Sequence, residues 1–238
     1  ATTDDSFAVN SNRPAVIVDG NGLLASGFVL SATASGTTIR GLVIRQFAYD
    51  AVNIQAGSNN HLIAGNYLGR FTATGTDAGA LEKNGGYGVY VGGNNNVIGG
   101  TMAADRNVIS GNGKNGIILD GANAFGNVVA GNYIGTLASG QTALGNTEDG
   151  VQLQAGANNN EIGGLAAGAR NVIAGNLNAG IALDHANTGF NLVRGNYIGL
   201  ATDGVTVVAN SHDGVHFEGA ASNTIGGTTA AARNVIAG

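Results

Sequence analysis

Asp184, His216 and Glu218 are the side chains in this sequence whose types and spacing best fit acid–base chemistry. Asp184 ends the phrase GIALD, and His216 and Glu218 belong to GVHFE, a phrase of the same form. If the two phrases are neighbouring parallel strands in register, Asp184 and Glu218 face the same way with their backbones about 5 Å apart. A retaining glycosidase uses a carboxylate pair at that range. The alternative is an ordinary solvated strand face, which also carries Asp, Glu and His.

The elements that would position these side chains repeat at a nearly fixed period. Three phrases recur: GNYLG or GNYIG from Gly65, Gly131 and Gly195, RNVI from Arg106, Arg170 and Arg233, and IGG from Ile98, Ile162 and Ile225. Their steps are 66 and 64 residues for the first phrase and 64 and 63 for the second. Such self-similarity is typical of a solenoid. We therefore expect one elongated domain over residues 1–238, with an irregular lead-in at residues 1–15.

Short apolar runs bounded by Gly and Asn make up each repeat. The chain has 42 Gly and a single Pro, which argues against a helix-rich protein because Gly costs about 1 kcal/mol relative to Ala inside a helix. The runs alternate, so Ile117 and Leu119 share one face of the phrase GIILD. Each repeat has two runs that follow a Gly, at Gly116 and Gly150 for example, and so forms two coils. The pattern predicts an all-β, right-handed parallel β-helix of about seven coils.

An Asn after Gly marks recurring turns between the runs. The five positions are Asn66, Asn112, Asn132, Asn176 and Asn196. Asn tolerates the left-handed conformation, and stacked amides can form hydrogen bonds from one coil to the next. A structural Asn ladder is therefore predicted, with a ligand role as the alternative. The Arg before each NVI phrase is expected to stack or to form an ion pair within the scaffold; anion binding is the alternative.

The phrasing NVISGN…NGIILD…GNYIG…IGG resembles the right-handed parallel β-helix repeat proteins of the pectin-lyase-like superfamily. More narrowly, it is similar to bacterial exported or surface proteins with tandem copies of this unit, and the resemblance covers about Val16 to Gly238. It implies the fold, but the superfamily mixes polysaccharide lyases, hydrolases, epimerases, adhesins and inert stalks. Pectate lyases with this fold use several acidic calcium ligands and a basic residue on one strand face. Here the corresponding column holds no Lys or Arg, and the polygalacturonase motifs are absent.

Three loops follow the GNYIG phrases, at residues 70–86, 136–148 and 200–212. Because their steps equal two coils, the loops are expected to project in a row from one side of the solenoid. Hydroxyl and amide side chains dominate them and could bind a sugar. The candidate binding residues are Thr142, Asn146, Asp203, Asn210 and His212. The alternative is that these loops only cover the surface.

Charge and composition limit which partners and cofactors this chain can have. The formal charge of −5 argues against nucleic acid and anionic membranes as partners. No apolar stretch approaches the roughly 18 residues of a membrane span. The chain has no Cys, so disulfides and thiolate metal sites are excluded. No His pair has a ligand spacing on a defined element, so neither a metal site nor a cofactor is predicted; weakly bound calcium in a loop is the alternative.

The residues that repeat most strongly build scaffold, which favours a non-catalytic extracellular β-helix: a surface stalk, an adhesin module or a filament building block. Its partners would be further copies of itself or a polysaccharide, and its place the outside or surface of a cell after bacterial-type export. The C-terminus is expected to be uncapped, so that the solenoid continues or stacks end to end. One alternative is a polysaccharide lyase or glycoside hydrolase with Asp184, His216 and Glu218 as catalytic residues. The other is a carbohydrate-binding module that uses the loops.

Overall fold

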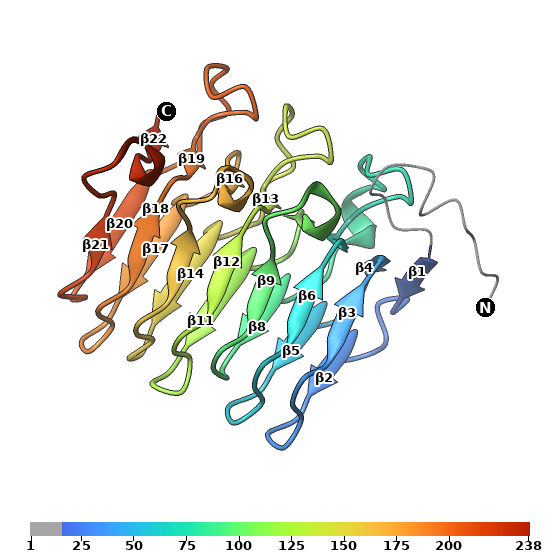
Figure 1. Cartoon of the computed structure of the whole chain (residues 1–238). Helices are drawn as coiled ribbons and strands as arrows, with labels where there is room; N and C mark the ends of the chain where they lie inside the picture. The colour runs from blue at the N-terminus through green and yellow to red at the C-terminus, as the bar shows by residue number, and fades with distance from the viewer. Residues whose placement is uncertain (1–15) are drawn as a thin grey trace.

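Three parallel β-sheets run along the molecule and enclose a narrow core (Figure 1). The computed structural model describes residues 16–238, so the expected lead-in lies outside the described residues. The chain visits the sheets in a fixed order, one strand in each per coil, and the predicted right-handed parallel β-helix is confirmed. The sheets contain seven, seven and eight strands, in agreement with the expected number of coils.

Each sheet collects strands of one position in the coil. Sheet 1 contains β2 (Phe28–Leu30), β5 (Val52–Ile54), β8 (Val89–Val91), β11 (Ile117–Asp120), β14 (Val151–Gln154), β17 (Ile181–Asp184) and β20 (Val215–Glu218). Sheet 2 contains β3 (Thr38–Arg40), β6 (Leu62–Ala64), β9 (Val97–Gly99), β12 (Val128–Ala130), β15 (Glu161–Gly163), β18 (Leu192–Arg194) and β21 (Thr224–Ile225). Sheet 3 contains β1 (Val16–Asp19), β4 (Leu42–Arg45), β7 (Tyr67–Gly69), β10 (Val108–Ser110), β13 (Tyr133–Ile134), β16 (Val172–Ile173), β19 (Tyr197–Ile198) and β22 (Val235–Ile236).

The helical content of the described chain is small. It consists of the 3₁₀ turns η1 (Ala80–Glu82), η2 (Ala103–Asp105), η3 (Ala167–Ala169) and η4 (Ala230–Ala232). Over residues 16–238, no helix has the length and apolarity needed to cross a membrane.

Alternation along each strand decides which side chains fill the core. In β14, Val151 and Leu153 point inward and are fully buried, whereas the two glutamines of the strand are half-buried on the outer face. The parallel register places Val151 between Ile117 and Ile181, so each inward side chain stacks on its equivalents in the neighbouring coils. Full burial of such a side chain contributes about 1.5–3 kcal/mol before chain entropy is subtracted. This repeated stacking compensates for the shortness of the strands.

The two most prominent phrases of the sequence are alternate strands of sheet 3. Val108 of RNVIS pairs with Tyr67 of the preceding GNYLG phrase and with Tyr133 of the following GNYIG phrase. Val172 lies between Tyr133 and Tyr197 in the same way. The solenoid therefore alternates between two kinds of coil, and the predicted two coils per repeat are confirmed.

Three Asn ladders stabilise the turns between the sheets. The ladder before sheet 3 contains Asn66, Asn107, Asn132, Asn171, Asn196 and Asn234. The ladder before sheet 1 contains Asn84, Asn112, Asn146, Asn176 and Asn210. The ladder before sheet 2 contains Asn96, Asn127, Asn160, Asn191 and Asn223. In each ladder the side-chain amide donates to the Oδ1 of the Asn one coil further on, at 2.9–3.1 Å.

The predicted ladder was right in kind but wrong in membership. Asn66, Asn132 and Asn196 belong to the ladder before sheet 3, whereas Asn112 and Asn176 belong to the ladder before sheet 1. No two of the five form a hydrogen bond with each other. Those in the same ladder are separated by an Asn that the sequence had not assigned to a ladder. The GN phrase occurs at two different corners of the coil, and its spacing alone does not distinguish them.

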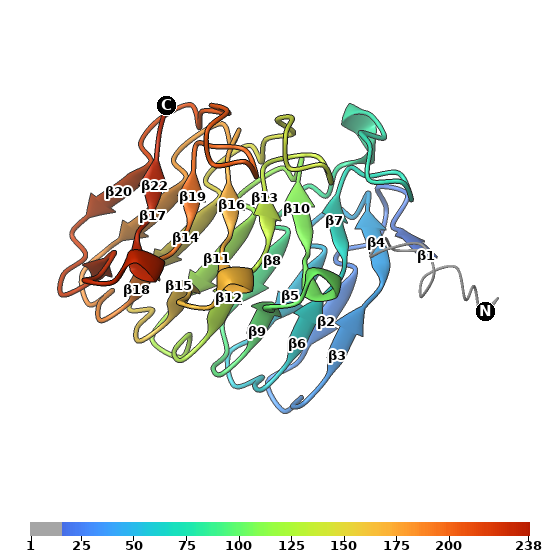
Figure 2. The ribbon, with the colours of Figure 1, turned by 45° about the horizontal axis from the view of Figure 1, so that its top comes forward.

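The three long loops project in a row from one end of sheets 1 and 3, as predicted (Figures 1 and 2). They follow β7, β13 and β19, and each closes through one antiparallel bridge near its base. Neighbouring loops are hydrogen-bonded, since Ala138 N donates to Gly75 O at 3.3 Å and Thr202 N donates to Gly140 O at 3.2 Å. The row of loops is therefore a continuous structure that flanks the outer face of sheet 3.

Candidate functional site

The outward face of sheet 1 brings the predicted catalytic residues together. Asp184 in β17 pairs in register with Glu218 in β20, and His216 lies on the same side of β20. One ligand atom from each of the three side chains lies within 4.8 Å of the others. The side chains of His216 and Glu218 are exposed, while that of Asp184 is half-buried. The alternation of GIALD and GVHFE thus predicted a real convergence of two carboxyl groups and one imidazole.

Hydrogen bonds from the preceding coils hold Asp184 in place. Gln152 Nε2 donates to Asp184 Oδ2 at 2.8 Å. Asn115 Nδ2 in turn donates to Gln152 Oε1 at 2.7 Å, so the glutamine amide is itself oriented. The other carboxylate oxygen, Oδ1, is buried and has no hydrogen-bond partner among the described residues.

The surroundings of His216 raise the pKa of its imidazole. Its Nδ1 lies 2.9 Å from Asp213 Oδ2. The hydrogen bond to Asp213 is the main cause that raises the pKa of His216 above its usual value, and the charges of Asp184 and Glu218 raise it further. When protonated, His216 places a positive charge beside the two carboxyl groups.

Asp149 is a further carboxyl group behind this cluster that the sequence did not single out. It is only 5% exposed and accepts hydrogen bonds from Asn178 Nδ2 at 2.8 Å and Ala179 N at 2.9 Å. Burial is the main cause that raises the pKa of Asp149, and the negative charge of Asp184 adds to it. The two carboxyl groups are therefore electrostatically coupled through the outer face of sheet 1.

The cluster could also hold a metal ion. Asp184, His216 and Glu218 each offer one ligand atom, and two carboxylates with one imidazole form a donor set that suits divalent cations. Sequence spacing gave no sign of this, because the ligands come from two strands on adjacent coils. The prediction that no metal site exists therefore stays a prediction.

A groove on the first coils of the same sheet was missed by the sequence reasoning. It has a volume of about 460 Å³, and its lining includes Tyr49, Asp50, Asn53, Tyr87, Tyr90 and Lys114. The rings of Tyr87 and Tyr90 are 6.0 Å apart, and Lys114 Nζ lies 5.0 Å from the centre of the Tyr87 ring. The available signal was that four of the six tyrosines lie between residues 49 and 90, three of them outside the GNYLG phrase.

Tyr90 connects this groove to the middle of the sheet. Its hydroxyl donates to Asp120 Oδ2 at 3.0 Å, and Gln154 Nε2 donates to Asp120 Oδ1 at 3.1 Å. Burial, followed by the hydrogen bond to Asp120, raises the pKa of Tyr90 to about 12. Tyr90 thus remains a neutral hydrogen-bond donor at physiological pH. A chain of polar side chains consequently extends over the outer face of sheet 1 from the groove towards Asp184.

The predicted loop residues do not form a binding site of their own. Asn146 and Asn210 are buried members of the ladder before sheet 1, so their prediction as binding residues was wrong. Asp203 is exposed but caps its own turn, since it accepts hydrogen bonds from Val205 N, Thr206 N and Thr206 Oγ1. Thr142 and His212 are exposed, and neither lines a groove described here.

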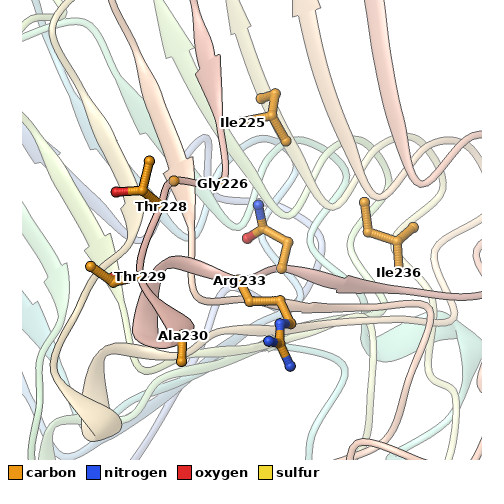
Figure 3. A pocket seen from close by; sticks show the side chains of 9 residues that line it. Ile225, Gly226, Thr228, Thr229, Ala230, Arg233 and Ile236 are labelled. Carbon is orange, nitrogen blue, oxygen red and sulfur yellow. The ribbon is translucent and has the colours of Figure 1, made fainter.

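A hollow of about 430 Å³ lies on the last described coil (Figure 3). Ile225 and Ile236 line it, at the register positions of the fully buried Val193 and Ile198 one coil earlier. Their side chains are 37% and 49% exposed. These two walls are thus core positions of the solenoid, whereas Thr228, Thr229, Arg233 and Asn234 provide polar lining.

Known proteins resemble this chain in fold. No protein-family model matches it, and no curated protein matches it. A solved structure of the periplasmic alginate epimerase AlgG aligns with a TM-score of 0.52 and 16% identity, and covers 92% of this chain and 54% of that one. A structure of an AlgG point mutant aligns with a TM-score of 0.52 and 17% identity, over 89% and 46%. The chain thus spans about half the length of these proteins, and at this identity the likeness shows the fold alone.

Proposed function

We propose that this protein binds a polysaccharide along the outer face of sheet 1 and cleaves it at Asp184, His216 and Glu218. The observation that carries the proposal is the convergence of these three side chains within 4.8 Å on an accessible strand face. Two carboxylates at about this separation fit a double displacement with retention at the anomeric carbon. The enzyme alternative is thereby better supported than the non-catalytic stalk.

The surroundings suggest a different role for each carboxylate. Asp184 is held in one orientation by Gln152, which suits a nucleophile that forms a bond to the anomeric carbon. Glu218 is exposed and suits the general acid, which gives its proton to the leaving oxygen and then takes one from the attacking water. When protonated, His216 would place a positive charge beside the nucleophile.

The rest of the face supplies binding surface for a long substrate. The groove with Tyr87 and Tyr90 offers apolar ring surface together with hydroxyl donors. Such a combination suits sugar rings, which have both apolar faces and hydroxyl edges. The structural neighbours are alginate epimerases, which supports a polysaccharide as the substrate class. Their periplasmic location supports an exported location for this protein.

A screen of acidic and neutral polysaccharides for new reducing ends and for unsaturated products tests this proposal. Asp184→Asn and Glu218→Gln should each reduce turnover by roughly a hundredfold or more, the range expected for loss of an acid–base group. Glu161→Gln is the matched control, because Glu161 lies on sheet 2 and pairs with Arg194. Turnover that survives both site substitutions would refute the assignment.

The screen also separates the remaining functions. Binding of a polysaccharide without turnover would favour the carbohydrate-binding module, and its loss in Tyr87→Ala would locate the binding surface on sheet 1. Absence of both binding and turnover would favour the stalk, adhesin or filament role. In that case electron microscopy at high protein concentration should show filaments, whereas strictly monodisperse particles would count against self-association.

A further inference from the structure

The outer face of sheet 3 carries arginines stacked on tyrosines. The Cζ atom of Arg106 lies 4.1 Å from the ring centre of Tyr133, and that of Arg170 lies 4.1 Å from the ring centre of Tyr197. These residues come from the RNVI and GNYIG phrases, which form alternate strands of the sheet between β10 and β19 (Figure 2). The predicted stacking of the arginines before NVI is thus confirmed at two positions.

The stacked arginines keep most of their hydrogen-bond donors unused. Four other arginines of the described chain pair with carboxylates: Arg40, Arg45, Arg70 and Arg194. Arg106 and Arg170 have no carboxylate partner among residues 16–238, and Arg106 Nε is buried without any hydrogen-bond partner there. Arg170 uses only its Nε, which donates to Gly195 O at 3.0 Å. Stacking on a ring occupies the face of a guanidinium and leaves its in-plane N–H groups free.

A hollow of about 200 Å³ joins the two pairs. Both arginines and both tyrosines line it, together with Thr202 and the 167–168 backbone turn. The long loops fix the ring positions from the side, because a Cβ on Gly140 would lie 2.9 Å from the Tyr133 ring and one on Gly204 would lie 2.5 Å from the Tyr197 ring. The guanidinium groups are therefore held in place before any ligand binds, which lowers the entropy cost of binding.

The spacing of the arginines suits a repeating anionic polymer. Arg106 and Arg170 are two coils apart along the solenoid, or about 10 Å at the spacing of parallel strands. Arg233 has the same position in its RNVI phrase, and its side chain is exposed (Figure 3). A guanidinium binds a carboxylate through two parallel hydrogen bonds, and nearby hydroxyls such as Thr202 Oγ1 can bond sugar hydroxyls.

We propose that sheet 3 binds the carboxylates of an acidic polysaccharide, a chain of uronic acid residues, through Arg106 and Arg170. This surface is on a different sheet from Asp184 and Glu218, so the inference does not depend on the proposed catalytic activity. It would retain the polymer on the protein whether or not sheet 1 cleaves it.

Calorimetric titration of the full chain with linear oligogalacturonate tests this binding. Arg106→Gln with Arg170→Gln should weaken it by roughly tenfold or more, as expected for loss of hydrogen bonds to a charged group. Arg194→Gln, which removes one equally charged side chain from sheet 2, should leave the affinity within about twofold. A neutral cello-oligosaccharide of equal length and free galacturonate should bind much more weakly than the oligomer. Repeating the titration in Asp184→Asn/Glu218→Gln protein separates this surface from the sheet 1 site.

Arginine footprinting provides a test without substitutions. The oligomer should protect Arg106 and Arg170 of the native protein from phenylglyoxal, as measured by mass spectrometry, and should leave Arg194 on sheet 2 unprotected. Equal affinity of the double variant and the native protein would overturn the proposal, as would modification that the oligomer does not slow. Tighter binding of a sulfated polysaccharide or of single-stranded DNA would overturn the assignment to carboxylates.

Discussion

Replacement of Asn146 by alanine should destabilise the solenoid by about 2.5–7.5 kcal/mol, although Asn146 lies in a loop segment rich in exposed polar residues. Asn146 Oδ1 accepts hydrogen bonds from Asn112 N at 3.2 Å and Asn112 Nδ2 at 2.9 Å. Its own Nδ2 donates to Ile109 O at 3.0 Å and Asn176 Oδ1 at 2.9 Å. Four buried hydrogen bonds therefore end at one side chain.

The magnitude follows from what each partner keeps after the substitution. Asn112 N loses its acceptor completely, which costs about 1–3 kcal/mol for a buried donor. Asn112 Nδ2, Ile109 O and Asn176 Oδ1 each keep another partner, so each loses about 0.5–1.5 kcal/mol. Asn146→Asp should cost at least as much. A carboxylate oxygen would then replace the donor Nδ2 and would face two other acceptors, Ile109 O and Asn176 Oδ1.

Urea unfolding followed by circular dichroism measures the change in the free energy of unfolding, and amide hydrogen exchange at Asn112 reports the local effect. Exchange matters because repeat proteins do not always unfold as one cooperative unit. Thr142→Ala is the control from the same loop, and its effect should stay within about 0.5 kcal/mol because the side chain is exposed. A change below about 1 kcal/mol for Asn146→Ala, with unaltered exchange at Asn112, would refute the ladder argument.

Two further predictions concern the loops and the sheet 1 site. Gly204→Ala should cost about 1–2 kcal/mol in thermal unfolding, because Gly204 has φ +70° and a Cβ there would lie 2.5 Å from the Tyr197 ring; an unchanged midpoint would contradict this packing. Asp213→Asn should lower the pKa of His216 towards its ordinary value, and Asp184→Asn should lower it less, as NMR titration of the imidazole can show. Since folding raises this pKa, His216 stabilises the fold below about pH 6.5, and that contribution is lost as the pH rises through the folded value. A larger shift in Asp184→Asn than in Asp213→Asn would contradict the assigned cause.

The carboxylate pair could be predicted because it depends on two regularities that are visible in the chain. Strand alternation places Asp184 and Glu218 on the outer face, and the repeat period places their strands on adjacent coils. The hydrogen bond from Gln152 to Asp184 could not be predicted from these regularities. It depends on side-chain rotamers two strand positions apart, which no periodicity determines.

The Asn residues show where the same reasoning fails. Asn112 and Asn146 occupy equivalent corners on consecutive coils, but one follows a short turn and the other a long loop. In the sequence the first belongs to a GN phrase and the second to a loop that resembles surface decoration. The register of the coils makes them partners, and this register depends on packing of the core beneath them.

The sequence by itself determined the solenoid, its two kinds of coil and the outward direction of Asp184, His216 and Glu218, because these depend on local alternation and a fixed period. Only the tertiary structure decided which asparagines share a ladder, which tyrosines form a groove on sheet 1, and which arginines stack on sheet 3 with free donors. The ladder and arginine contacts join residues separated by 25 or more positions along the chain. They form only when each coil stacks on the previous one. The distance between the partners is then set by the spacing of neighbouring strands, whatever their separation in the sequence.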